Sequence, residues 1–114
     1  MLMLVEAIIR PQKVADVKAA LAAIGVKGLT VTEALGAGNE RGYSHTYRGA
    51  EYAMTLVQRI KIEVAVLDRE ARVVADAIMN AARTGQVGDG KIFLIPIADA
   101  QRIRTGEEGR DAIE

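Results

Sequence analysis

The stretch RIKIEVAV (residues 59–66) decides the fold, because it alternates branched apolar residues with charged or small ones. That period of two is typical of a β-strand with one buried face. The next residues change to a helical period, with Asp68 predicted as the N-cap, Glu70 in the first turn and Gly85 as the stop. A strand followed at once by an amphipathic helix indicates half of a β-α-β unit.

The other half of the chain repeats this order. Residues 2–9 form an apolar run closed by Arg10 and Pro11, which predicts a buried strand. Apolar residues at helical spacing predict a helix over 14–24, ended by Gly25, and a β-branched cluster predicts a strand over 28–35. With a last strand over 91–97, we expect an α+β, ferredoxin-like βαββαβ sandwich.

The first strand is apolar on both sides, since Leu4 and Ile8 alternate against Val5, Ala7 and Ile9. Both helices of a ferredoxin-like sandwich cover the same sheet face, so the second face would stay bare. A bare apolar face predicts that the chain associates with copies of itself.

Composition limits the class of protein. The chain has 114 residues, fifteen basic and fifteen acidic side chains and no cysteine. These values predict one domain, residues 1–114, without disulfides or thiolate chemistry, and a net charge of zero argues against a nucleic-acid binder. No stretch is long enough to be a signal peptide or to span a membrane, so we expect a cytoplasmic protein.

Residues 37–57 contain several glycines and charged groups and have no sustained period, which predicts a long loop. Loops of about twenty residues inside small domains are usually functional or disordered. Partner recognition is therefore expected first in this segment, and a plain connection between strands is the alternative. It holds His45, the only histidine, and no nucleophile, acid–base pair or metal cluster accompanies it, so we expect no enzyme and no metal centre.

Residues 85–91, GQVGDGK, have the G-x-x-x-x-G-K spacing of a phosphate loop. Ile92 stands where such a loop needs serine or threonine, and the segment runs from helix into strand, opposite to a true phosphate loop. The remaining interpretations are a glycine-rich anion site beside Lys91 and a tight turn. Arg102 and Arg104 would project to one side of an extended tail over 99–114, where they can bind phosphate.

Five stretches resemble the PII signal-transduction proteins, the trimeric nitrogen-regulatory family, along nearly the whole chain. They are EAIIRP (6–11), GLTVTE (28–33), YRGAEY (47–52), TGQVGDGKIF (84–93) and RIRTGE (102–107). The resemblance implies a homotrimer that buries the bare sheet face, with 37–57 as the family's T-loop between the second and third strands.

The resemblance also implies ATP or ADP sites in the clefts between protomers. The matching residues are Thr30, Gly36, Gly38, Glu63, Gly88, Asp89, Gly90, Lys91, Arg102 and Arg104. Glycine amides, Lys91 and the two arginines would neutralise phosphates, and Thr30 and Glu63 would help to read the base.

The T-loop of the family inserts into partners, namely the ammonium channel and nitrogen-metabolism enzymes. Arg48 matches the arginine that plugs channels, so a channel partner could recruit this chain to the membrane. Tyr52 matches the tyrosine that a uridylyltransferase modifies in many bacterial members, and Ala50 replaces the serine phosphorylated in cyanobacterial members.

Three departures fall at the family's site for magnesium-ATP with 2-oxoglutarate. Glu40 stands where glutamine is usual, Arg59 replaces the usual lysine and Ala37 replaces a phenylalanine. Glu40 adds an anion beside a dicarboxylate, which should weaken 2-oxoglutarate binding. The alternative function is therefore a PII-like regulator of carbon metabolism or of a transporter, which reads adenine nucleotides with another small anion.

Overall fold

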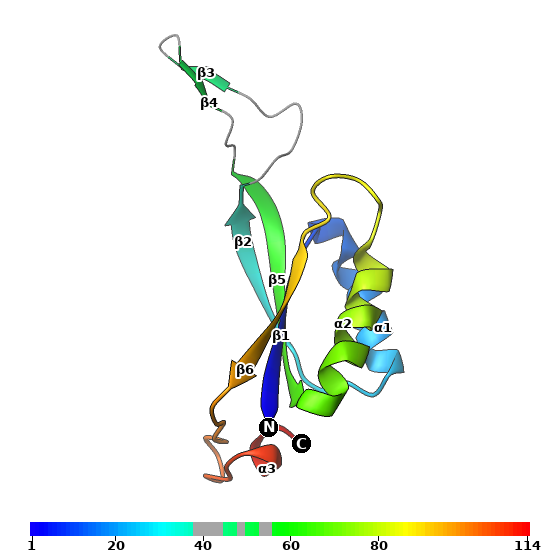
Figure 1. Cartoon of the computed structure of the whole chain (residues 1–114), viewed down its shortest axis with the longest axis vertical. Helices are drawn as coiled ribbons and strands as arrows, with labels where there is room; N and C mark the ends of the chain where they lie inside the picture. Colours follow the sequence, from blue (N-terminus) through cyan, green and yellow to red (C-terminus); the bar gives the residue numbers. More distant parts are fainter. Residues whose placement is uncertain (38–44, 48–49, 53–55) are drawn as a thin grey trace.

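The computed structural model describes residues 1–37, 45–47, 50–52 and 56–114. It confirms the ferredoxin-like α+β sandwich (Figure 1). Its elements, in chain order, are β1 (Leu2–Ile9), the 3-10 helix η1 (Pro11–Lys13), α1 (Val14–Ala23), β2 (Thr30–Gly36), β3 (His45–Tyr47), β4 (Ala50–Tyr52), β5 (Val57–Leu67), α2 (Asp68–Ala82), β6 (Lys91–Ile97) and α3 (Arg110–Ile113). No helix in these ranges is long and apolar enough to cross a bilayer.

The main sheet has the order β2-β5-β1-β6, and every neighbouring pair is antiparallel. Helices α1 and α2 lie side by side on one face of this sheet (Figure 1). The loop end is where β2 finishes and β6 begins, and the tail end is where β1 begins and β6 finishes.

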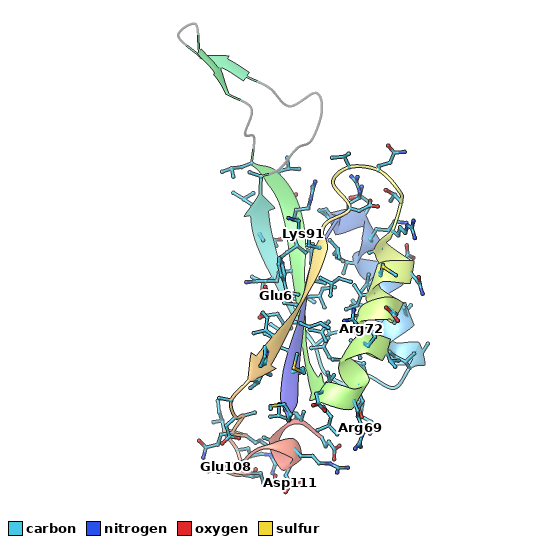
Figure 2. All side chains as sticks on the ribbon, in the orientation of Figure 1. Glu6, Arg69, Arg72, Lys91, Glu108 and Asp111 are labelled. Carbon is cyan, nitrogen blue, oxygen red and sulfur yellow. The ribbon has the colours of Figure 1, made fainter. Side chains whose placement is uncertain are left out.

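The hydrophobic core fills the layer between the sheet and the helices (Figure 2). Alternate residues of β1 and β5 point into it, so Val5 faces Val64 across the strands and Ala7 faces Ile62. Helix α1 contributes Val17 and Leu21, and α2 contributes a buried stripe of Ala71, Val74, Ala75, Ile78 and Ala82. The apolar residues with a period of two and those with a helical period therefore pack in one core.

Neither α1 nor α2 covers the opposite sheet face (Figure 1), where β1 and β6 carry mostly apolar side chains. Phe93 and Ile95 of β6 are 44% and 38% exposed, and Ile95 pairs with Leu4 of β1 in the register. Glu6 lies between Phe93 on one side and Glu63 on the other, so two carboxylates are direct cross-strand neighbours on this face. The bare face predicted from β1 is present in the single chain.

Two local predictions, the N-cap and the extended tail, were wrong, and one short hairpin was missed. Asp68 is the first residue of α2 rather than its N-cap, because Leu67 takes the extended cap conformation and no side chain caps the helix. Within 37–57, β3 and β4 pair as a short hairpin, which the lack of periodicity did not predict. The tail over 99–114 folds back on itself, with a bridge between Gln101 and Glu108, and is not extended.

Candidate functional site

The glycine-rich segment connects α2 to β6 at the loop end of the sheet. Gly85, Gly88 and Gly90 all have positive φ, a backbone conformation that L-residues with side chains rarely adopt. Gly90 also lies against β1, because a Cβ built on it would come 1.7 Å from the carbonyl oxygen of Ile8. Glycine at position 90 is thus required both by backbone conformation and by the close approach of two chain segments.

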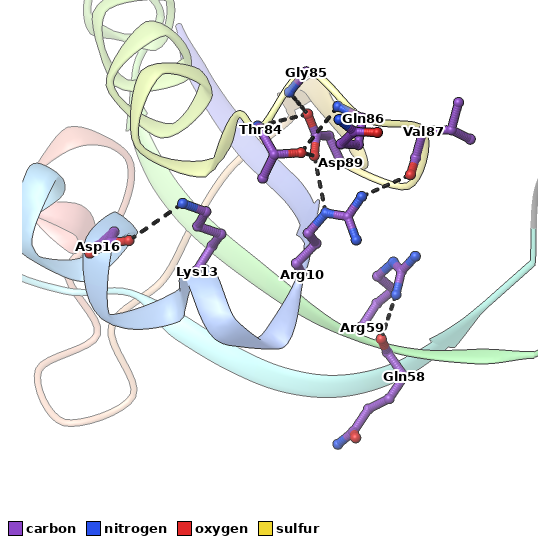
Figure 3. A network of polar contacts seen from close by, with 10 residues as sticks. All are labelled: Arg10, Lys13, Asp16, Gln58, Arg59, Thr84, Gly85, Gln86, Val87 and Asp89. Carbon is purple, nitrogen blue, oxygen red and sulfur yellow. Dashed lines mark hydrogen bonds and ion pairs between the residues drawn. The ribbon is translucent and has the colours of Figure 1, made fainter. Parts of the chain in front are cut away.

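Asp89 holds this segment together from inside (Figure 3). Its Oδ2 accepts hydrogen bonds from the amides of Thr84 (2.9 Å) and Gly85 (2.8 Å), and its Oδ1 accepts from the Thr84 hydroxyl and from Arg10 Nε (3.1 Å). The Gln86 amide donates to the Thr84 hydroxyl oxygen at 3.1 Å. The segment from 84 to 89 is therefore a compact turn around one carboxylate.

These donors stabilise the charged form of Asp89. The Thr84 hydroxyl has the largest effect and acts with the amides of Thr84 and Gly85 and with Arg10, so the pKa of Asp89 lies well below its usual range although partial burial raises it. A lowered pKa in the folded state means that this contribution to stability is complete above the ordinary aspartate pKa. It is lost only when pH falls through the lowered value.

Arg59 lies at the same end of the sheet, and its side chain is buried. Its Nη1 donates to the carbonyl oxygen of Gln58 at 2.8 Å, and its Cγ is 3.4 Å from where a Cβ of Gly36 would lie. Burial and the neighbouring positive charge of Arg10 lower the pKa of Arg59. Two guanidinium groups thus lie near each other beneath the glycine-rich turn, where they favour anions.

Thr30 and Glu63 are cross-strand partners where β2 begins. They line a cleft of about 850 Å³ between this edge of the sheet, the connection 24–29 and the start of α2. Ile113 and Glu114 at the end of the chain line the same cleft. The two residues that the resemblance assigns to the base are therefore direct cross-strand neighbours that line one cleft.

Arg102 and Arg104 lie beyond the tail end of the sheet. The Arg102 amide donates to Glu107 O and the Gly106 amide to Arg102 O, both at 2.8 Å, so residues 102–107 form a turn in place of the predicted extended tail. Gly106 permits this turn through its φ of 77°. The Arg102 guanidinium donates to Glu107 Oε1 (2.8 Å) and to Glu114 O (2.7 Å), which leaves some of its five N–H donors for another acceptor.

One chain does not bring the predicted nucleotide residues together. Gly36 and residues 88–91 lie at the loop end with Arg59, whereas Arg102 follows the far end of β6. Seven residues of strand at about 3.3 Å each separate these ends by roughly 20 Å. Figure 2 shows the same separation, with Lys91 distant from Glu108 and Asp111 of the tail. Gly38, Glu40 and Arg48 lie outside the described residues, as does the side chain of Tyr52.

Arg10 is a residue of the candidate site that the sequence analysis does not identify. The sequence pattern indicates only that a strand ends at Arg10, but its side chain donates to Asp89, 79 positions later, and to Val87 O at 2.8 Å. Arg10 directly precedes Pro11 and follows the last residue of β1, so its side chain can reach the neighbouring loops. No spacing in the sequence pairs it with residue 89.

The comparisons with known proteins agree over nearly the whole chain. The sequence pattern of the family "Nitrogen regulatory protein P-II" matches residues 2–107. The nitrogen regulatory protein P-II of Rhizobium meliloti is 50% identical over 109 residues, covering 96% of this chain and 97% of the relative. Nitrogen regulatory protein GlnK2 of Haloferax mediterranei is 52% identical over 110 residues, covering 96% and 89%.

Among solved structures, Arabidopsis thaliana PII bound to citrate superposes with a TM-score of 0.80 and 37% identity, covering 97% of this chain and 91% of the plant chain. The order of elements, the glycine-rich turn and these matches lead to one conclusion. This chain belongs to the family of nitrogen regulatory P-II signalling proteins.

Proposed function

We propose that the chain binds ATP or ADP between copies of itself and that the bound nucleotide sets the conformation of segment 37–57, its T-loop. Through this segment it would regulate a target protein without chemistry of its own. A ligand shifts such an equilibrium only through unequal affinity for the two states, and the third phosphate of ATP can supply the difference from ADP.

The glycine-rich turn supports the phosphate part of this proposal. In the described part of the chain, no protein acceptor takes a hydrogen bond from the amides of Gly88 and Asp89. Amides of successive residues in a glycine-rich turn form an anion-binding concavity, and the exposed Lys91 adds a full positive charge beside them. The negative charge of Asp89 is offset by its four donors.

The observation that carries the proposal is the separation of the site residues along β6. The turn and Lys91 lie at one end of this strand and Arg102 beyond the other, roughly 20 Å apart. A triphosphate is too short to bridge them within one chain. Two copies arranged around the bare sheet face would place the turn of one beside the arginines of the next. Association of copies would then complete the nucleotide site and cover the bare face.

The homotrimer would also cover the apolar residues that the single chain leaves exposed. Phe93 and Ile95 expose large side chains on the bare face, together with the partly exposed Leu4 and Ile8. Burial of such a face among copies is favourable by about 25 cal/mol per Å² of apolar area.

The partner side of the proposal rests on family membership. One relative carries the name GlnK2, and we propose an ammonium channel or a nitrogen-metabolism enzyme as the target of segment 37–57. Arg48 would contact a channel, and Tyr52 would be the uridylylation site. The chain would then work in the cytoplasm and move to the membrane only when its channel binds.

Calorimetric titration with ATP and magnesium tests nucleotide binding. We expect Lys91→Ala and Arg102→Ala each to weaken ATP binding by about 1.5–3 kcal/mol, the loss of a hydrogen bond to a charged group. Arg48→Ala is the control, because it should leave ATP affinity unchanged while weakening the target complex. Failure of the wild-type chain to bind ATP or ADP would refute the proposal.

Glu40 makes a second prediction, on the small anion that accompanies the nucleotide. We expect weak 2-oxoglutarate binding by the wild type in the presence of magnesium-ATP, and about ten-fold tighter binding by Glu40→Gln, which removes a like charge. Titration of both proteins with 2-oxoglutarate gives the answer. Tight binding by the wild type would contradict the prediction and identify an ordinary 2-oxoglutarate sensor.

The alternative function, a regulator that reads another small anion, is favoured by the buried Arg59 beside Arg10. Paired guanidinium groups can hold carboxylates in a bidentate geometry that a lysine cannot. The related plant protein was solved with citrate, a tricarboxylate. Citrate and bicarbonate are therefore the first alternatives to titrate against the nucleotide-bound protein.

A further inference from the structure

Arg10 ties the glycine-rich turn to the end of β1 by side-chain charge. Its Nε donates to Asp89 Oδ1 at 3.1 Å and its Nη2 donates to Val87 O at 2.8 Å, so the guanidinium spans the turn (Figure 3). The pair is partly shielded from water, with 19% of the Arg10 side chain and 23% of the Asp89 side chain exposed. An ion pair of this kind is less screened by salt than one on the open surface.

The Asp89 carboxylate has little capacity left for a ligand. It already accepts four hydrogen bonds, two at each oxygen, and a carboxylate offers about four lone-pair positions. The sequence resemblance placed Asp89 among the nucleotide contacts. The geometry assigns its side chain to the interior of the turn, and leaves the amides of Gly88 and Asp89 without a protein acceptor among the described residues.

The charge of this carboxylate also needs an explanation, because an anion beside a phosphate site repels the ligand. Arg10 supplies one full positive charge, and the Thr84 and Gly85 amides supply partial ones. The turn can therefore use the strong, directional acceptor that a carboxylate provides while its net local charge stays near zero.

We propose that Arg10 and Asp89 together are the positioning residues of the phosphate-binding turn: they fix residues 84–90 so that the amides of Gly88 to Gly90 and the Lys91 ammonium meet the phosphates, without contacting the nucleotide themselves. The identity of the ligand rests on the proposed function, whereas the fixed turn does not. Gly90 anchors the second end of the same turn against Ile8.

The first test measures the turn without any nucleotide. Amide hydrogen exchange of the ligand-free protein should show Thr84 and Gly85 exchanging about ten-fold faster in Asp89→Asn than in the wild type, since the substitution removes the charged acceptor. Asp16→Asn is the matched control. It makes the same chemical change in an exposed ion pair with Lys13 at 3.8 Å, and it should leave both amides unchanged. Unchanged exchange in Asp89→Asn would overturn the inference even if the chain binds ATP.

The second test is a double-mutant cycle on ATP affinity. We expect Asp89→Asn and Arg10→Lys each to weaken ATP binding by about ten-fold, because lysine keeps the charge but cannot donate to Asp89 and Val87 O together. The double variant should bind ATP much less weakly than the two single losses multiplied together, since both changes break the Arg10–Asp89 contact. Additive losses of about a hundred-fold would show that each residue touches the ligand on its own, and would overturn the inference.

Comparing ATP with AMP separates positioning from a general loss of structure. A misplaced phosphate turn should lower the ATP to AMP affinity ratio in both single variants, and Asp16→Asn should keep the wild-type ratio. An equal loss for ATP and AMP would assign the pair to general stability and overturn the positioning role. If the wild type binds neither nucleotide, the proposed function fails, and the exchange measurement still decides the role of Asp89 in the turn.

Discussion

Replacing Gly90 by alanine is expected to destabilise the chain by about 3–5 kcal/mol, since left-handed strain and overpacking add at one position. Gly90 has a φ of 100°, and the new Cβ would lie 1.7 Å from Ile8 O and 2.8 Å from Ile8 C. Both atoms belong to the backbone of a central strand, so no side-chain rotation can relieve the overlap. Thermal unfolding at one fixed protomer concentration measures the loss, and ATP titration should show no binding.

Gly25→Ala is the matched control for this prediction. Gly25 has a similar φ of 90°, but a Cβ there meets nothing within 4 Å. Only the strain of the left-handed conformation remains, so a loss of about 1–2 kcal/mol is expected. Equal stabilities of the two variants would contradict the close approach of Gly90 to β1.

The second large effect concerns the core. Ile62→Ala should cost about 3–5 kcal/mol, because Ile62 is fully buried and its truncation leaves a cavity in addition to the lost apolar burial. The residue lies in β5, which pairs with both β1 and β2, so its surroundings cannot collapse easily. Denaturant unfolding, compared at one protomer concentration, gives the difference directly.

Val73→Ala serves as the comparison, since Val73 lies on α2 and is 58% exposed. This change should alter the free energy of unfolding by less than about 0.5 kcal/mol, as surface substitutions usually do. A loss of less than about 1.5 kcal/mol for Ile62→Ala would mean that β5 is not the centre of the core.

The main elements of the fold could be predicted from the sequence because their patterns report burial directly. The alternation over 59–66 appears as β5, where Ile60, Ile62, Val64 and Val66 are buried. The apolar run of β1 is explained by its position between β5 and β6, with one face on the core. Helices and strands that bury one face in a common core show a clear period in sequence. These periods were sufficient to predict the order of the main elements.

Short elements with local causes could not be predicted in the same way. Strands β3 and β4 have three residues each, too few for a period, and the turn over 102–107 depends on hydrogen bonds between nearby residues. Asp68 had the right residue type for a cap, but Leu67 already provides the extended residue before the helix. These outcomes depend on backbone angles that composition does not specify.

Part of the local structure around the candidate site could be predicted. Glycine spacing correctly marked residues 85–91 as a special turn, and the register brings Thr30 and Glu63 together. The Arg10–Asp89 pair could not be predicted, because its partners are 79 residues apart and meet only after the sheet has formed. The separation of Lys91 from Arg102 is likewise a property of strand direction, visible only once β6 is placed.

The central claim is that one copy supplies the phosphate-binding turn and another supplies Arg102. Mixing Lys91→Ala and Arg102→Ala protomers in equal amounts, after unfolding and refolding together, tests it most directly. An intact site then needs Lys91 from an Arg102→Ala protomer and Arg102 from a neighbouring Lys91→Ala protomer. Random assembly of equal amounts gives this pairing at about a quarter of the sites, so we predict that about a quarter of the wild-type ATP sites return at wild-type affinity. The double variant, refolded alone, should recover none. No recovery of sites in the mixture, with both single variants folded, would show that the site does not lie between copies and would contradict the account.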